Sequence, residues 1–212
     1  MVTSTLTNNT ALEGSTLCQH CGLCCNGAIF SHVLVDKKEE KQAKKSGLVL
    51  RKKSDKKMFT LPCSCFIDNK CSIYKDRPMR CSGYRCNLLK AVVNGETPFE
   101  EAKDLVTSTK QETQWLLENR TAKSKNPNQK ENLTKYLKSY RNLASKINDT
   151  TALSPKDKRY ILRAFDYLKV IDRAFHPTST LGLYASLIQG FNTTSKVFKI
   201  KANKISARPK KG

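Results

Sequence analysis

The sequence Cys18-Gln19-His20-Cys21-Gly22-Leu23-Cys24-Cys25 places four thiols within eight residues. Two cysteines that are separated by two residues can direct both sulfurs at one soft cation, while the backbone amides between them point back at the thiolates. Gly22 would ease the turn that this requires, because glycine adopts left-handed conformations without strain. The adjacent pair Cys24 and Cys25 fits poorly to the spacing of a disulfide framework. We therefore interpret this stretch as a metal-binding loop.

The other cysteines follow in two further segments. The first is Leu61-Pro62-Cys63, and the second is Cys71-Ser72-Ile73-Tyr74-Lys75-Asp76-Arg77-Pro78-Met79-Arg80-Cys81 with Tyr84-Arg85-Cys86 behind it. Together with the opening stretch, these segments resemble the YkgJ-type cysteine-cluster family, the zinc- or iron-chelating CxxCxxCC domain. The resemblance covers about residues 18 to 90. It implies a metal site rather than a particular reaction.

Two residues depart from the family pattern. Ser82 stands where the family often has an arginine, and Cys65 is an extra thiol. We expect the remaining cysteines to bind metal, namely Cys18, Cys21, Cys24, Cys25, Cys63, Cys71, Cys81 and Cys86. Eight thiols suffice for two four-ligand sites, and one site with spare cysteines is consistent with the spacing as well.

The identity of the metal is left open between zinc and iron. Four-thiolate sites suit structural zinc and iron–sulfur clusters alike. The Cys-x-x-Cys-x-x-Cys spacing resembles the start of a ferredoxin motif but lacks the Cys-Pro that completes it, so zinc is slightly favoured. Within Cys71–Cys86, we expect Arg77, Arg80 and Arg85 to offset the negative charge of the thiolates, with Arg77 as the strongest candidate.

The redox state of the cysteines follows from the compartment. The chain of 212 residues contains no run of 18 apolar residues that would predict a transmembrane helix. Residues 1–17 lack the positive and apolar regions of a signal peptide. We therefore expect a cytoplasmic protein, in which thiols stay reduced and bind metal rather than pair as disulfides.

The positive charge is distributed unevenly along the chain. Of the net +21, residues 1–120 carry 19 Lys and Arg against 13 Asp and Glu, a net +6, and residues 121–212 carry 20 against 5, a net +15. Such an excess suggests contact with nucleic acid, an acidic protein or an anionic membrane surface. A solvated basic face explains it equally well.

The predicted fold class is α+β, with a small metal-stapled cysteine-cluster domain followed by a mainly α-helical C-terminal part. Hydrophobic periodicity and helix-start signals predict its elements. Strands are expected at residues 28–35, 47–53 and 57–61, and helices at 36–45, 87–93, 98–119, 133–147, 154–175 and 181–188. The expected organisation is a mobile arm at 1–16, the metal-binding domain at 17–95, a helical region at 96–195 and a basic tail at 196–212.

No reaction can be assigned from the sequence. It contains no phosphate-binding glycine loop, nucleophile elbow or metalloprotease helix motif, so whether the protein is an enzyme stays undecided. We expect a metal-chelating binding or assembly module whose basic C-terminal part contacts an acidic protein or nucleic acid. The alternative is an iron–sulfur oxidoreductase or electron-transfer protein.

Overall fold

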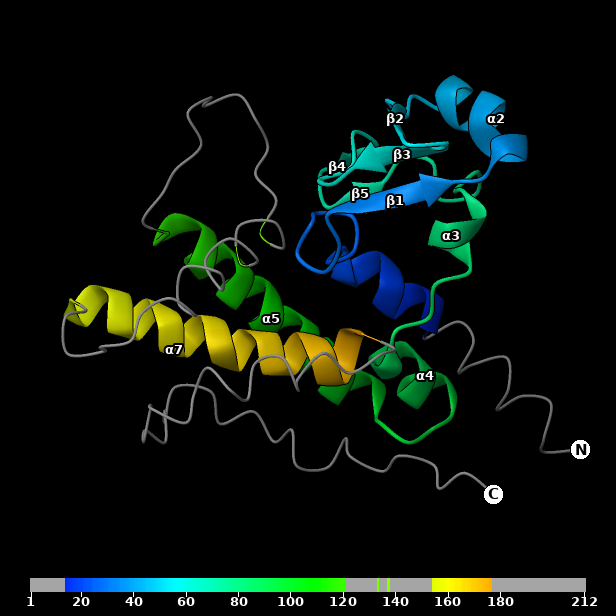
Figure 1. Cartoon of the computed structure of the whole chain (residues 1–212). Helices are drawn as coiled ribbons and strands as arrows, with labels where there is room; N and C mark the ends of the chain where they lie inside the picture. Colours follow the sequence, from blue (N-terminus) through cyan, green and yellow to red (C-terminus); the bar gives the residue numbers. More distant parts are fainter. Residues whose placement is uncertain (1–13, 121–132, 134–136, 138–153, 177–212) are drawn as a thin grey trace, which may run out of the picture.

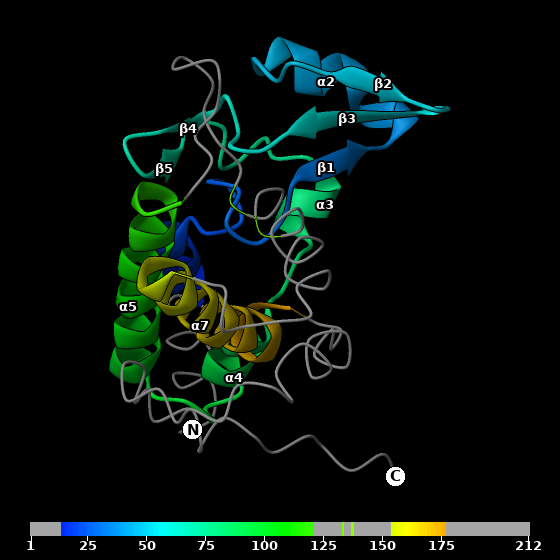
Figure 2. The same cartoon turned by 60° about the vertical axis from the view of Figure 1, so that its left-hand side comes forward.

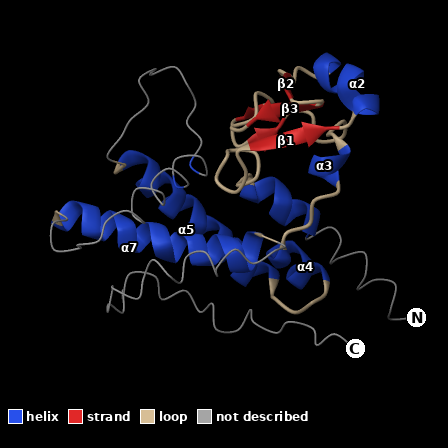
Figure 3. Ribbon diagram, viewed as in Figure 1, coloured by secondary structure: helices blue, strands red, loops and turns tan. Residues whose placement is uncertain are grey.

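The structure, a computed structural model, describes residues 14–120, 133, 137 and 154–176. Two small sheets with short helices form one part of the molecule, and the longer helices form the other (Figure 3). The predicted α+β class and the helical C-terminal part are therefore confirmed. The long helices α5 and α7 pack against each other beside the cysteine-rich segments (Figures 1 and 2).

A three-stranded antiparallel sheet of order β1-β3-β2 follows the first cysteines. Its strands are β1 (His32–Val35), β2 (Arg51–Lys53) and β3 (Lys56–Thr60). The strand predicted at 47–53 is present in shorter form as β2, and that predicted at 57–61 is present as β3. The two strands pair as a hairpin, and Ser54 lies in its turn with a φ of 53°. The strand predicted at 28–35 is shorter than expected, because Ala28 and Ile29 are buried against the helices instead of continuing β1.

A second, two-stranded sheet carries Cys71. It consists of β4 (Phe66–Ile67) and β5 (Lys70–Cys71), in which Phe66 pairs with Cys71. Asp68 and Asn69 form the turn and have φ values of 48° and 60°. Asp and Asn tolerate this left-handed conformation, which a two-residue hairpin turn needs at both positions.

The helices begin close to the predicted capping signals. Cys86 caps α4, and the Ser154 hydroxyl accepts a hydrogen bond of 3.1 Å from the Asp157 amide at the start of α7. Pro98, the expected first residue of the helix at 98–119, is instead the N-cap of α5, and no side chain caps this helix. The helical elements are η1 (Lys37–Glu39), α2 (Glu40–Lys45), α3 (Met79–Ser82), α4 (Asn87–Val93), α5 (Phe99–Glu118), α7 (Pro155–Val170) and the π-helical turn η2 (Ile171–Phe175).

Two buried apolar clusters hold these elements together. The first joins the segment around Leu17 and Leu23 to α4, α5, α7 and η2, and it also buries Leu133 and Leu137. The second lies between the three-stranded sheet and α2, and it contains Phe59 and Ala43. Burying apolar surface contributes about 25 cal/mol per Å² to the free energy of folding. These two clusters are therefore the main stabilising feature among the described residues.

Several predicted segments lie outside the described residues. These are residues 1–13 of the arm, all of the 133–147 helix except Leu133 and Leu137, the 181–188 helix and the basic tail. Residues 14–16, which the sequence places in the mobile arm, are helical, since they begin the helix that buries Leu17 in the first cluster. The predicted domain boundaries stay a prediction.

Candidate metal centre

The opening cysteines divide between a helix and a turn. Residues 14–21 are helical, so that Cys18 and Cys21 lie three positions apart on one face, whereas we expected a loop there. Gly22 ends the helix with a φ of 65°, which confirms the expected turn. A Cβ at position 22 would come within 2.5 Å of the Phe66 ring. Gly22 therefore allows the first cysteine segment to pack closely on the hairpin that carries Cys71.

A first group of thiols lies between the end of helix 14–21 and the start of α4. Burial, together with smaller effects of Cys86 and Cys18, raises the pKa of Cys21 to about 12. Burial also raises the pKa of Cys24 well above its usual range, and Cys21 and Cys86 contribute smaller increases. Cys21, Cys24 and Cys86 all pack against the first apolar cluster. We call Cys18, Cys21, Cys24 and Cys86 the first thiol group.

A second group lies beside the three-stranded sheet. Burial, together with smaller effects of Cys71, Cys63 and Cys81, raises the pKa of Cys25 to about 12. Cys63 belongs to the second apolar cluster and Cys81 packs against it. The Cys63 amide donates to the Cys25 carbonyl at 2.8 Å, which ties the opening segment to this group. We call Cys25, Cys63, Cys71 and Cys81 the second thiol group.

The two groups are neighbours rather than distant sites. Cys18 also raises the pKa of Cys25 and of Cys71, in both cases as a smaller effect than burial. Cys18 is the exposed thiol, while the other seven predicted ligands are buried or partly buried. In addition to burial, Cys25 in turn raises the pKa of Cys24, so the adjacent cysteines Cys24 and Cys25 connect the two groups.

Backbone amides point at several of the sulfurs, as the spacing predicted. Burial is the main influence on these thiols, but hydrogen bonds from the amides of Leu23 and Ile73 lower the pKa values of Cys21 and Cys71, respectively. The Leu89 amide donates to Cys86 Sγ at 3.3 Å, where Cys86 caps α4. Amide donors and a helix N-terminus both favour the thiolate, the form that binds metal.

Each group has one nearby cation that also favours thiolates. Arg77 lowers the pKa values of Cys71 and Cys81, which burial raises, so its predicted role is supported. The guanidinium of Arg77 is held by the Tyr74 carbonyl at 2.8 Å and lies 3.6 Å from the centre of the Tyr74 ring. Two other arginines were expected to act similarly, but Arg80 pairs with Asp36 at 3.5 Å and Arg85 binds nearby carbonyls.

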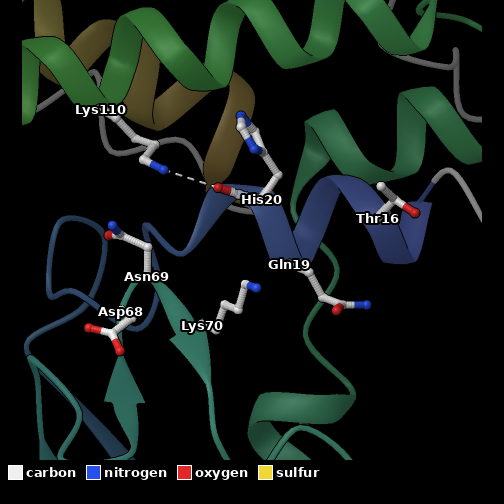
Figure 4. Close-up of a pocket in the computed structure, with 7 residues that line it drawn as sticks. All are labelled: Thr16, Gln19, His20, Asp68, Asn69, Lys70 and Lys110. Atoms are coloured by element: carbon white, nitrogen blue, oxygen red, sulfur yellow. Dashed lines mark hydrogen bonds between the residues drawn. The ribbon is translucent and has the colours of Figure 1, made fainter.

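Lys110 of α5 is the cation beside the first thiol group, and the sequence analysis missed it. It lowers the pKa of Cys21, although burial has the larger, opposite effect. Its ammonium donates to the His20 carbonyl at 3.1 Å, which caps the end of helix 14–21 (Figure 4). Nothing in the sequence marks this lysine, because it lies far along the chain from every cysteine. A hollow of about 340 Å³ opens beside it, lined by Thr16, Gln19, His20, Asp68, Asn69, Lys70 and Lys110.

Cys65 differs from the eight predicted ligands in its contacts. It is buried in the second apolar cluster, and its thiol donates to the Ser46 carbonyl at 3.3 Å. It also raises the pKa of Cys63, after burial. Cys65 thus packs behind the second thiol group and bonds to the backbone on its other side.

The donor set fits a soft metal ion. All eight residues are free thiols, and metal ions such as zinc and iron bind thiolates at four-ligand sites. Among the residues that the structure describes, no three Cys, His, Asp or Glu side chains converge closely enough to hold one ion. The eight ligands therefore stay a prediction, which the grouping, the amide donors and the two cations support.

An α+β unit with nine free cysteines and clustered thiols is typical of a small metal-chelating domain. Residues 17–116 match the CxxCxxCC family model, described as "Putative zinc- or iron-chelating domain". This part of the chain is therefore similar to the CxxCxxCC domain, the family that its sequence resembles. The match includes every predicted ligand and extends into α5. It supports metal binding and leaves the choice between zinc and iron open.

The other comparisons identify no relative. Neither a curated protein nor a solved structure matches the chain. Within the described part of the chain, no helix combines the length and the apolar composition needed to cross a membrane.

Proposed function

We propose that the CxxCxxCC domain binds two metal ions, one through each thiol group, and that the protein acts as a binding or assembly module. The observation that supports this proposal is that, in addition to burial, Cys86 and Cys18 raise the pKa of Cys21, whereas Cys71, Cys63 and Cys81 raise that of Cys25, and that Lys110 and Arg77 lower the pKa values of thiols in the first and second group, respectively. The metal would replace the protons that burial keeps on these thiols. It would thereby join segments from residues 18 to 86 into one unit.

Zinc is the favoured metal for such a structural role. Zinc has no redox chemistry and forms closed four-thiolate sites that contribute directly to folding. In this proposal the protein is cytoplasmic, where thiols remain reduced. The basic residues 121–212 contact an acidic protein or nucleic acid, and most of them lie outside the described residues.

Iron is the second candidate, with an oxidoreductase or electron-transfer role. The observation that favours it is the first thiol group, which combines Cys-x-x-Cys-x-x-Cys with the remote Cys86. Many ferredoxins bind their clusters with three closely spaced cysteines and one distant cysteine. In this reading, the amide donors and Lys110 would tune the reduction potential of the cluster.

Metal analysis of the full chain, purified with and without air exclusion, tests both candidates. If the metal is zinc, the protein should contain about two equivalents of zinc and be colourless after both purifications. Visible absorption that dithionite bleaches, seen only after anaerobic purification, would support the iron–sulfur candidate instead. Less than about one equivalent of either metal under both conditions would contradict metal binding altogether.

A further inference from the structure

The basic charge of the first 120 residues is concentrated in one small unit. Residues 36–57 carry 10 Lys and Arg against 4 Asp and Glu, a net +6. The rest of residues 1–120 has 9 against 9 and is neutral. The whole excess therefore lies on η1, α2 and the β2–β3 hairpin, which are separate in the sequence from the basic residues 121–212. Figures 1 and 2 both show α2 beside β2.

Five of these lysines form a stripe along one side of η1 and α2. Positions 37, 38, 41, 44 and 45 recur at helical spacing, and all five side chains are exposed. The opposite side of α2 is apolar, since Ala43 is buried against the sheet in the second cluster. The lysine stripe therefore faces solvent along the length of the helix.

Two lysines of the hairpin extend this stripe. Lys57 shares its face of β3 with Phe59, because alternate residues of a strand point to the same side. Phe59 is buried in the cluster that contains Ala43, so this is the sheet face that α2 covers. Lys52 pairs with Lys57 across the strands and stands on the same face. We call the seven residues together the basic face: Lys37, Lys38, Lys41, Lys44, Lys45, Lys52 and Lys57.

The fold does not neutralise the basic face. Among the described residues, none of its lysines forms an ion pair, and two carboxylates of this unit have other partners. Asp36 pairs with Arg80, and Glu39 accepts the Met79 amide at 2.8 Å. Like charges directly opposite in a ladder, as at Lys52 and Lys57, are destabilising. Residue pairs that destabilise a fold, such as these two opposed lysines, are expected mainly at functional surfaces.

We propose that the basic face binds the phosphate backbone of double-stranded nucleic acid. A duplex carries one negative charge per about 1.7 Å of its axis, so several lysines of the face can be engaged at once. Lysines act as point charges and do not read base edges in the bidentate way of arginine. The binding is therefore independent of sequence. This surface is additional to the proposed metal sites and to the basic C-terminal part.

The composition of the surface favours a duplex over a single strand. Binding of single strands relies on exposed aromatic rings that stack on bases. The large apolar side chains that are exposed in the described residues are Val49, Ile67, Met79 and Val93, and none of them is aromatic. Contact through phosphates alone fits a paired helix, whose bases are already stacked.

A salt series with the metal-loaded full chain tests this proposal. The probe is a fluorescent duplex of about 20 base pairs, titrated between about 50 and 200 mM salt. The face variant combines Lys41→Gln, Lys45→Gln and Lys52→Gln. The matched control combines Lys75→Gln, Lys90→Gln and Lys156→Gln, which removes the same charge from exposed positions elsewhere. Equal metal content in the three proteins shows that folding is unaffected.

Removing three phosphate contacts should lower the slope of log K against log salt by roughly 2.7, and the affinity at low salt by at least tenfold. The control should stay within about twofold of wild type, since its lysines lie outside the face. Equal losses in the two variants, or unchanged binding by the face variant, would overturn the proposal. Tighter face-dependent binding to anionic lipid vesicles or to polyglutamate than to the duplex would also overturn it.

Discussion

Cys63 and Cys65 lie two residues apart and are both buried, but their surroundings differ. In addition to burial, Cys63 raises the pKa values of Cys25 and Cys81, and its amide donates to the Cys25 carbonyl at 2.8 Å. The Cys65 thiol instead donates to the Ser46 carbonyl at 3.3 Å. Because Cys63 and Cys65 are both buried but differ in their contacts, single substitutions of each can test whether Cys63 is a metal ligand and Cys65 is not.

We expect Cys63→Ala to lose about one of two metal equivalents, and Cys65→Ala to keep both. Both changes remove a buried thiol of similar exposure, so a general effect on folding would appear in both variants. Metal content relative to protein concentration, measured after anaerobic purification, is the readout. Loss of metal from Cys65→Ala would show that the ninth cysteine is a ligand.

The raised pKa values of the thiols predict a strong pH dependence of metal binding. Burial raises the pKa values of Cys21, Cys25 and Cys81 to about 12, so these thiols are protonated in the metal-free protein at neutral pH. Metal must displace those protons, which means that affinity rises with pH. Because the folded pKa values are raised, the thiols favour the metal-free fold below pH 9 and lose this contribution as pH increases toward 12.

We expect zinc binding at about pH 7.5 to release roughly four protons per ion. Titration of metal-free protein in a weakly buffered dye solution counts these protons directly. Apparent affinity should also increase steeply between about pH 6 and pH 8. Release of about one proton per ion would mean that most ligands are not thiols, or that their thiols are already ionised.

At the scale of elements, the contact between α5 and α7 depends on a mostly buried ion pair. Arg163 Nε donates to Glu112 Oε1 at 2.7 Å, and a second contact joins Arg163 Nη2 to Glu112 Oε2. The Glu112 side chain is 4% exposed and that of Arg163 is 22% exposed. The guanidinium also lies 3.6 Å from the centre of the Trp115 ring. Removing either partner would leave a charge buried without its counter-ion.

We expect Arg163→Met to lower the free energy of unfolding by about 3 kcal/mol, because Glu112 remains buried and unpaired. The double variant Arg163→Met with Glu112→Leu should recover most of this loss, since it buries no charge. Urea unfolding of the metal-loaded proteins measures both values. A decrease of less than about 1 kcal/mol in the single variant would mean that solvent screens this ion pair, which then contributes little to the free energy of unfolding.

Local signals predicted most of the elements. The α4 helix at Asn87–Val93 and the β2–β3 hairpin appear where turn residues and periodicity placed them. The helix at residues 14–21 was missed, because it contains two cysteines and few strong helix formers. Its apolar Leu17 is held by the first cluster, which is a tertiary contact that no local pattern reveals.

At the scale of the whole molecule, the sequence predicts eight cysteine ligands but does not indicate which of their thiols lie near one another. Spacing alone suggests that Cys18, Cys21, Cys24 and Cys25 belong to one site. In addition to burial, Cys86 raises the pKa of Cys24 although more than sixty residues separate the two, whereas the thiols with the largest effects on Cys25 are Cys71, Cys63 and Cys81. Lys110 joins the same group from α5. These associations depend on packing between distant segments and could not be derived from motif spacing.

The division into two thiol groups is tested most directly by counting metal ions in paired variants. Native mass spectrometry of anaerobically prepared protein should show about two ions in the wild type. Cys21→Ala with Cys86→Ala should keep about one ion, as should Cys63→Ala with Cys81→Ala, and the fourfold variant should keep none. Loss of both ions from either double variant, or retention of both, would contradict two separate four-thiol sites.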